Sequence, residues 1–331
     1  MTSTSLELIA DIGGTNARFA LTDPADPTPR LLQSRSLCNA QFASLQHAAE
    51  HYLADVGVRP RRAAIAVASP VGNDAIRLTN REWSFSRREL RAALGLEQLR
   101  VLNDFGAVAW AVPALAADDR ATLHGSATTP LEGPVTVLGP GTGLGIAMLV
   151  GTSDAAWQVV ETEGGHATFA PIGKEEHSIA RWMTARFGRV SNERLLCGTG
   201  LAHIEALLRG KTGKYKLPTL RDPADIVAAA LEGHDISARR SLARFCAVLG
   251  SVAGDAALIH GARTVMIAGG IMPRFVPFLR SSAFRERFLA KGRFAAYLES
   301  VTIHVVVHPH PGLLGAAVAL RAAAASEPAE P

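Results

Sequence analysis

The sequence predicts a globular α/β protein with two related halves, each containing a glycine-rich turn between two strands. Its 331 residues are enough for two domains of usual size. Hydrophobic residues account for 48% of the chain and charged residues for 19%, so a large apolar core can form. The pattern of apolar strand, Gly/Thr turn and second strand occurs at residues 6–21 and again at residues 134–150. This repetition indicates a duplicated α/β unit with a phosphate-binding turn in each half.

Charge and cysteine content exclude several classes of protein. The net charge of +4 results from 34 basic and 30 acidic residues, a balance that does not indicate binding to nucleic acid or to a membrane. Cys38, Cys197 and Cys246 are scattered, so we expect a reducing compartment without disulfides or structural zinc. Glu7 and Asp11 interrupt any apolar signal segment, and no apolar run is expected to span a bilayer. We therefore expect a soluble, cytoplasmic protein.

The first turn, residues 11–16 (DIGGTN), has the composition of a phosphate-binding loop, although two strands flank it and not the strand and helix of a P-loop. Gly13 and Gly14 lack a Cβ and can adopt positive φ, so backbone N–H groups can converge on an anion, and Thr15 adds a hydroxyl. Asp11 would repel a phosphate unless a divalent cation lay between them, which indicates Mg²⁺. For this stretch alone, an ordinary hairpin is the simpler explanation.

Helices and strands continue to alternate after this hairpin. Apolar spacing predicts a helix at residues 42–53 and a strand at residues 62–68. A strand predicted at residues 100–104 ends on Asn103 and Asp104, before a helix at residues 105–115. Ligands collect at the carboxyl ends of strands in open α/β sheets, so this pair is a candidate site. The alternative is that Asp104 only caps the helix, which suffices for this pair alone.

The second turn, residues 139–143 (GPGTG), lies between strands predicted at residues 135–138 and 144–150. Here Gly141, Thr142 and Gly143 repeat the residue types of the first turn. One such hairpin is weak evidence for phosphate binding. Two of them, with an acid beside the first, are difficult to explain by turn chemistry alone.

Polar residues in the second half form further candidates. Glu163 and His166 flank a Gly-Gly pair, which suits a hydrogen-bonding loop, although a solvated surface turn is an equally good explanation. Ser191 is expected to cap a helix whose first turn contains Glu193, and this glutamate could simply complement the helix dipole.

The remaining elements complete an α/β pattern. Residues 237–260 predict a long core helix. A buried strand at residues 264–268 leads into Gly269 and Gly270, where a flat ring such as adenine could lie against the backbone. A strand at residues 301–307 and a helix at residues 316–323 follow.

Taken together, these motifs resemble the bacterial glucokinases of the hexokinase/actin-like ATPase superfamily, of the enterobacterial type. The resemblance covers nearly the whole chain, and the order and approximate spacing of the motifs agree. It rests on residues 11–18 (DIGGTNAR), 79–86 (TNREWSFS), 103–105 (NDF), 139–145 (GPGTGLG), 163–166 (EGGH), 190–194 (VSNER), 268–275 (AGGIMPRF) and 311–315 (PGLLG).

The resemblance implies a fold and a reaction. The fold is the two-domain actin-like ATPase (ribonuclease H-like) fold with an interdomain cleft. A small domain would comprise residues 1–112 and 309–331, and a large domain residues 113–308. The reaction is phosphorylation of D-glucose to glucose 6-phosphate by ATP with Mg²⁺, and the family also suggests a homodimer.

The resemblance also implies a role for each candidate residue. Asp104 would be the catalytic base, and Asn103, Asp104, Glu163, His166 and Glu193 would bind glucose. The nucleotide would be bound by Asp11, Gly13, Gly14, Thr15, Asn16, Gly141, Thr142, Gly143, Gly269 and Gly270. Asp11 would hold Mg²⁺ through water.

Two departures from the family pattern bear on which family of sugar kinases the sequence resembles. Pro140 stands where a smaller residue is commoner, and it would stiffen the second turn. The related ROK sugar kinases carry a cysteine-rich zinc motif after the E-x-G-H segment, and this sequence has none. One rival function is a kinase for another hexose or phosphoryl donor; the other is a non-catalytic sugar sensor or regulator. Because the first strand begins near Leu6, we expect no helix-turn-helix before it.

Overall fold

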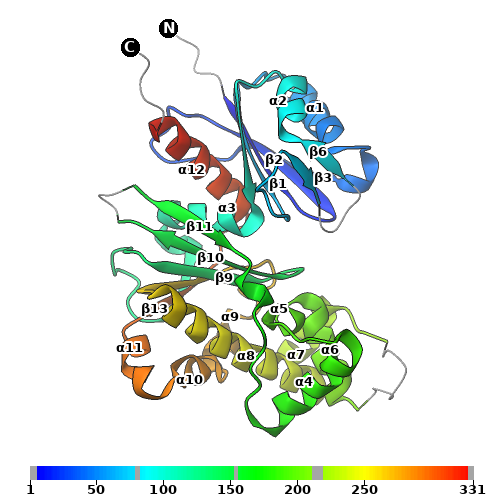
Figure 1. Ribbon diagram of the computed structural model, residues 1–331, viewed down its shortest axis with the longest axis vertical. Coiled ribbons are helices and arrows are strands. Elements are labelled where there is room, and N and C mark those ends of the chain that lie inside the picture. Colours follow the sequence, from blue (N-terminus) through cyan, green and yellow to red (C-terminus); the bar gives the residue numbers. More distant parts are fainter. Residues whose placement is uncertain (1–5, 79–82, 153–155, 211–218, 327–331) are drawn as a thin grey trace. The chain divides into compact units, whose positions relative to one another are not determined.

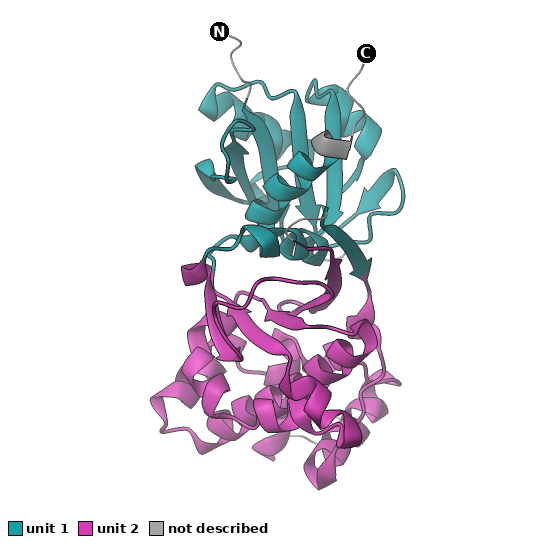
Figure 2. Ribbon diagram, turned by 90° about the vertical axis from the view of Figure 1, so that its left-hand side faces the viewer, with its two compact units in different colours: residues 1–116, 153–161, 308–331 teal, residues 117–152, 162–307 magenta. Residues whose placement is uncertain are grey.

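The computed structural model describes residues 6–78, 83–152, 156–210 and 219–326. The chain divides into two compact units. Unit 1 comprises residues 1–116, 153–161 and 308–331, and unit 2 comprises residues 117–152 and 162–307, as the colours in Figure 2 show. Part of the expected motif at residues 79–86 lies outside the described residues.

Unit 1 contains a five-stranded sheet in the order β3-β2-β1-β4-β7. Its strands are β1 (Glu7–Ile12), β2 (Asn16–Thr22), β3 (Leu32–Cys38), β4 (Arg62–Val67) and β7 (Gln98–Asn103). β1 and β2 form the expected antiparallel hairpin, whereas β1, β4 and β7 are parallel. In register, Ile12 pairs with Val67, and Val67 pairs with Asn103. The first glycine turn and the Asn103-Asp104 pair therefore follow strands that end at the same edge of the sheet.

Helices cover both faces of this sheet. Alternate residues of β1 point to opposite faces. Leu8 packs in a cluster with α1 (Leu45–Val56) and α2 (Arg87–Ala93), and Ile9 packs in a cluster with α12 (Pro311–Ser326) (Figure 1). Unit 1 also contains α3 (Asp104–Ala111), the two-stranded sheet β5 (Ala75–Arg77) and β6 (Ser84–Ser86), and the short 3₁₀ helices η1 (Asn39–Gln41) and η2 (Val112–Ala114).

Unit 2 contains five of the six strands of a second sheet, in the order β10-β9-β12-β13-β8. Its strands are β8 (Arg120–His124), β9 (Val135–Pro140), β10 (Leu144–Val150), β12 (Thr264–Ile267) and β13 (Thr302–Val306). β9 and β10 form the second expected hairpin, and β9, β12 and β13 are parallel. β11 (Gln158–Thr162) begins in unit 1 and ends in unit 2.

Helices form the rest of unit 2. The α-helices are α4 (Gly173–Phe187), α5 (Asn192–Leu195), α6 (Gly198–Leu208), α7 (Pro223–Glu232), α8 (Ile236–His260), α9 (Val276–Ser281), α10 (Phe284–Leu289) and α11 (Ala295–Glu299). The 3₁₀ helices are η3 (Ala117–Asp119), η4 (Gly164–His166), η5 (Met272–Phe275) and η6 (Gly292–Phe294).

Helix α8 is the core helix that the sequence predicts, but it corrects one expectation. Among the described residues, it is the one helix long and apolar enough to cross a membrane, so such a run does exist. In its most apolar stretch 72% is buried inside the protein, and Leu242, Phe245 and Leu249 belong to the core of unit 2. Burial against other helices, and not a bilayer, explains its apolar composition.

Two other predicted boundaries were wrong. β7 ends at Asn103, so Asp104 is the first residue of α3 and not the last of a strand. α12 begins at Pro311, before the predicted helix at residues 316–323. Proline is favoured at the first helical position because its fixed φ suits a helix and no N–H is needed there.

Candidate active site in two parts

The first glycine turn lies between β1 and β2 in unit 1. Gly13 N donates a hydrogen bond to Asn16 O at 3.0 Å, which closes the turn, while Gly14 and Thr15 are exposed. Neither glycine is among the described residues with positive φ, so the turn does not use this conformational freedom of glycine. The turn closes with ordinary backbone angles, and the advantage of glycine here is the absence of a side chain over the backbone N–H groups.

Asn39, which the sequence analysis missed, holds this turn in place. Its side chain is fully buried, and its Nδ2 donates to Gly13 O at 2.8 Å and to Gly14 O at 3.2 Å. Its backbone N donates to Thr15 O at 2.9 Å. Nothing in the sequence distinguishes this asparagine from one that ends a strand, because its partners lie more than twenty residues earlier.

Asp11 lies beside the turn at the amino end of α12. Its Oδ2 is 3.3 Å from Arg18 Nη1 on the neighbouring strand, and a Cβ at Gly312 would lie 2.9 Å from its Cγ. Only glycine at this position of α12 leaves room for the carboxylate. Burial raises the pKa of Asp11 above its usual value, while Arg18 and, more weakly, His310 act in the opposite direction.

This arrangement fits a magnesium ion. Mg²⁺ is usually held by one or two carboxylates, with waters and substrate phosphates completing its coordination. Asp11 supplies such a carboxylate next to a turn whose N–H groups suit a phosphate. In the described part of the chain, no group of three or more His, Cys, Asp or Glu side chains could hold a metal alone. Water and phosphate would therefore complete the coordination at Asp11.

At the same sheet edge, Asn103 caps α3. Its Oδ1 accepts hydrogen bonds from Phe105 N at 2.9 Å and from Gly106 N at 3.3 Å, and its Nδ2 lies 3.4 Å from Ser69 O. Asp104 Oδ1 also accepts from Phe105 N at 2.9 Å. The cap residue is thus Asn103, so capping is not a sufficient explanation for an aspartate at position 104.

In unit 2 the three polar residues predicted to bind a sugar lie together. His166 Nε2 is 3.9 Å from Glu163 Oε2, and His166 Nδ1 is 3.7 Å from Glu193 Oε1. The side chain of His166 is 53% exposed, that of Glu163 is 63% exposed and that of Glu193 is 31% exposed, so all three can contact a ligand. Neighbouring charged and polar groups of this kind suit a substrate with several hydroxyls.

Two loops are paired to bring these residues together. Phe169 N donates to Val190 O at 3.0 Å, and Asn192 N donates to Ala167 O at 2.9 Å. As predicted, Ser191 caps the short helix α5, and its hydroxyl accepts from Arg194 N. The loops are separated in sequence, so their convergence depends on these backbone hydrogen bonds.

Glu193 also contacts the second glycine turn. Its Oε2 accepts a hydrogen bond from Leu144 N at 3.0 Å, and a Cβ at Gly143 would overlap the same oxygen. Complementing the dipole of α5 is therefore not its sole role. The turn itself is closed by Gly141 N, which donates to Gly143 O at 2.7 Å, and Gly198 N at the start of α6 donates to Gly141 O at 3.1 Å.

Gly269 and Gly270 lie beside this turn. Gly269 has φ of +119°, which only glycine adopts readily, and a Cβ there would overlap Pro140 O. A Cβ at Gly139 would likewise overlap Ala268 O. The absence of a side chain thus allows Gly269, one of the two predicted adenine-binding glycines, to pack directly against the end of β9.

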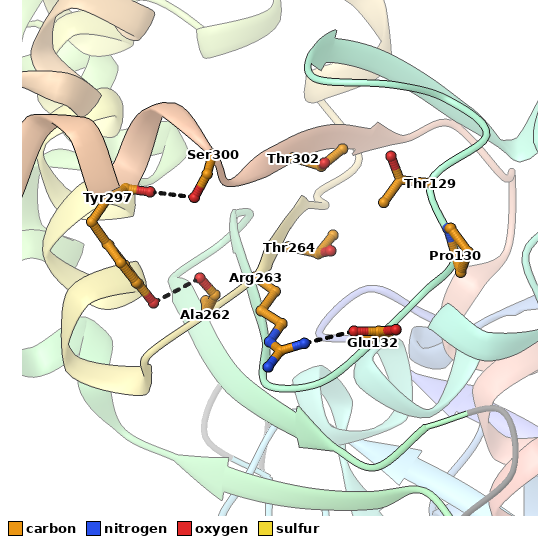
Figure 3. Close-up of a pocket in the computed structure, with 9 residues that line it drawn as sticks. All are labelled: Thr129, Pro130, Glu132, Ala262, Arg263, Thr264, Tyr297, Ser300 and Thr302. Carbon is orange, nitrogen blue, oxygen red and sulfur yellow. Dashed lines mark hydrogen bonds and ion pairs between the residues drawn. The ribbon is translucent and has the colours of Figure 1, made fainter.

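A separate pocket of unit 2, with a volume of about 400 Å³, contains none of the predicted site residues. It lies where β12 and β13 begin, at the opposite ends of these strands from Gly269. As Figure 3 shows, Arg263 pairs with Glu132 at 2.6 Å, and the Tyr297 hydroxyl donates to Ala262 O at 3.1 Å. Its charged groups therefore bind each other.

Together, these observations define a class of protein. Each unit has a glycine-rich turn suited to phosphate, unit 1 adds a carboxylate suited to Mg²⁺ and an aspartate at the start of a helix, and unit 2 adds side chains suited to hydroxyl groups. These are the groups that a sugar kinase needs in order to bind a nucleotide and a sugar. The sequence matches the glucokinase family over residues 8–323, and the chain belongs to that family.

Individual relatives agree with this assignment, and they confirm the resemblance noted in the sequence. A glucokinase of Chromobacterium violaceum is 42% identical over 316 residues, which cover 95% of this chain and 88% of that protein. A glucokinase of Caulobacter sp. strain K31 is 43% identical over 322 residues, covering 97% and 96%. A glucokinase crystal structure from an Antarctic psychrotroph has a TM-score of 0.82 and 36% identity, covering 96% of this chain and 98% of that one.

Proposed function

We propose that the protein phosphorylates D-glucose at its 6-hydroxyl, with ATP as the phosphoryl donor. The observation that carries this proposal is the position of Glu193 in unit 2. One carboxylate oxygen lies 3.7 Å from His166 Nδ1, and the other accepts the N–H of Leu144 at the end of the second glycine turn. Side chains suited to sugar hydroxyls and a turn suited to phosphate are thereby joined in one rigid contact.

The two turns bind the phosphates of ATP. Phosphoryl transfer requires mainly that the protein position its substrates and compensate their charge. Gly13, Gly14, Thr15 and Asn16 act in unit 1, and Gly141, Thr142 and Gly143 act in unit 2. Asp11 would hold Mg²⁺ through water, and the bound ion would neutralise charge on the phosphates. Gly269 and Gly270 accept the adenine ring against their backbone.

Sugar selectivity follows from the polar residues. Glu163, His166 and Glu193 hydrogen-bond hydroxyls that do not react. Asn103 already uses Oδ1 as the helix cap, so it contributes through its Nδ2 group. A site built to bond hydroxyls rejects a sugar lacking one, because its own polar groups would be left unpaired.

Asp104 acts as the general base that accepts the proton of the 6-hydroxyl as it attacks the γ-phosphorus. Its place as the first residue of α3, immediately after the cap, fixes its backbone. The wider arrangement that we propose is the two-domain actin-like ATPase (ribonuclease H-like) fold, with residues 1–112 and 309–331 in the small domain and residues 113–308 in the large one. A cytoplasmic homodimer completes the proposal.

The variant Asp104→Asn tests the mechanism. Asparagine keeps the shape and one acceptor but cannot take the proton, so the turnover number should fall by roughly 10²–10⁴-fold. The melting temperature should change little, because Asn103 and not Asp104 is the helix cap. A folded variant with near-normal turnover would rule out the base assignment. Measuring ADP release over a panel of hexoses and nucleotides separates glucose and ATP from the alternative substrates and from a non-catalytic sensor.

A further inference from the structure

The cap at the start of α3 lacks one of the two residues that a capping box usually has. In a capping box, the cap residue bonds the N–H of the third helical residue, and a Glu or Gln at that third position bonds the N–H of the cap. Asn103 makes the first bond here, but the third helical residue is Gly106, which has no side chain to return the second. The N–H of Asn103 needs another acceptor.

Glu161 supplies that acceptor from a different element. Its Oε1 accepts the backbone N–H of Asn103 at 3.0 Å. A Cβ at Gly106 would overlap Oε1, Cδ and Cγ of Glu161. The glutamate therefore occupies the space that a side chain at position 106 would need, and the absence of that side chain is what admits it.

The segment carrying Glu161 packs against the apolar cluster to which this helix contributes. Trp157 and Val159 pack against an apolar cluster that contains Ala107 and Trp110 of α3. Positions 157, 159 and 161 share one face of an extended segment, because side chains alternate along a strand. Trp157 and Val159 are half-buried on this face, whereas Glu161 is exposed at its end. Trp157 and Val159 hold the segment against this cluster, and Glu161 places a carboxylate at the amino end of α3.

We infer that Glu161 is a positioning residue for Asp104. It completes, from a separate segment of the same chain, the capping box of the helix that begins with this aspartate. The inference rests on the proposed role of Asp104 as the base. The inference also assigns a function to β11. Glu161 is the last residue of unit 1 before the chain enters unit 2, and Glu163 follows two residues later. One short segment thus fixes the start of α3 and leads directly into the proposed sugar-binding loop.

Glu161→Ala and Glu161→Gln test this inference. Removing the acceptor frees the first turn of α3, and small displacements of a reacting group cost up to about a hundredfold in rate. We expect kcat of the alanine variant to fall at least about tenfold, with an unchanged KM for ATP. The glutamine variant keeps a side-chain oxygen and should retain most of the activity. Gln158→Ala, on the opposite face of β11, is the control and should behave as wild type.

Restoring the capping box within the helix is the sharper test. In Glu161→Ala, the additional change Gly106→Glu puts a glutamate at the third helical position, from which it can reach the Asn103 N–H. The double variant should regain most of the lost kcat, whereas Gly106→Glu alone should be impaired because two glutamates compete for one space. Melting temperature and circular dichroism establish that each variant is folded.

Several results would overturn the inference. These are a normal kcat in folded Glu161→Ala, a lowered melting temperature as the sole effect, equal losses in the alanine and glutamine variants, or no recovery with Gly106→Glu. Combining Glu161→Ala with Asp104→Asn separates this inference from the proposed function. If Glu161 acts through Asp104, its loss should not lower kcat further once the base is gone. Normal turnover of Asp104→Asn alone would instead refute the base.

Discussion

Replacing Asn39 should weaken ATP binding while leaving glucose binding nearly unchanged. Its buried amide donates to the carbonyls of Gly13 and Gly14, and so holds the first glycine turn from one side. Asn39→Ala removes both donors. Asn39→Asp keeps the shape but places a carboxylate oxygen against two carbonyl oxygens, so it should be at least as damaging.

The structure gives a magnitude for this effect. Each hydrogen bond contributes about 1 kcal/mol net, so two contribute about 2 kcal/mol. Since 1.4 kcal/mol corresponds to about a tenfold change in affinity, the full loss would weaken nucleotide binding about thirtyfold. Gly14 is exposed, and water can replace part of the bond to its carbonyl. We therefore expect the KM for ATP to rise between about fivefold and thirtyfold.

Steady-state kinetics and calorimetry with ATP and with glucose measure this effect. Gln41→Ala is the matched control, because Gln41 lies exposed in the same 3₁₀ helix. Should both Asn39 variants fold and bind ATP normally, the turn would not need this support. Should glucose affinity fall instead, the turn would belong to the sugar site and the assignment of the first phosphate motif would be wrong.

Three further predictions follow from the same structure. Glu163→Gln and His166→Ala should each weaken glucose binding by about 1–3 kcal/mol and ATP binding much less; normal glucose affinity with impaired ATP affinity in calorimetry would reassign their loop. Chelation of divalent ions should stop turnover reversibly without lowering the melting temperature, because the metal is expected at Asp11 with the nucleotide; stoichiometric zinc in the purified protein would contradict this. Burial lowers the pKa of His304 from 6.5 to about 4. Between these two pH values the unfolded chain binds a proton that the folded protein does not. The free energy of unfolding should therefore fall by up to about 3 kcal/mol as the pH drops from 6.5 to about 4. Urea unfolding at several pH values measures it, and an equally steep loss in His304→Asn would assign the effect to another group.

The sequence alone was sufficient for features that depend on near neighbours. Both hairpins could be predicted because an apolar strand, a glycine-rich turn and a second strand are contiguous. Helix α8 could be predicted because its apolar stripe repeats with the helical period. The Asn103-Asp104 pair could be placed at a strand end for the same reason. The family resemblance rested on the order of such local motifs, and the comparisons confirm it.

Only the tertiary structure decided which distant groups meet. Glu193 and His166 converge because backbone hydrogen bonds pair two loops, and Asn39 reaches the first turn because β3 returns beside β2. Glu161 reaches the start of α3 because Trp157 and Val159 of the same segment pack against the apolar cluster that includes residues of this helix. The sequence left capping by Asp104 open as an alternative, whereas the cap is Asn103, one residue earlier, since strand and helix boundaries depend on sheet register. Register and packing are set by contacts between residues far apart in the chain, and no local pattern encodes them.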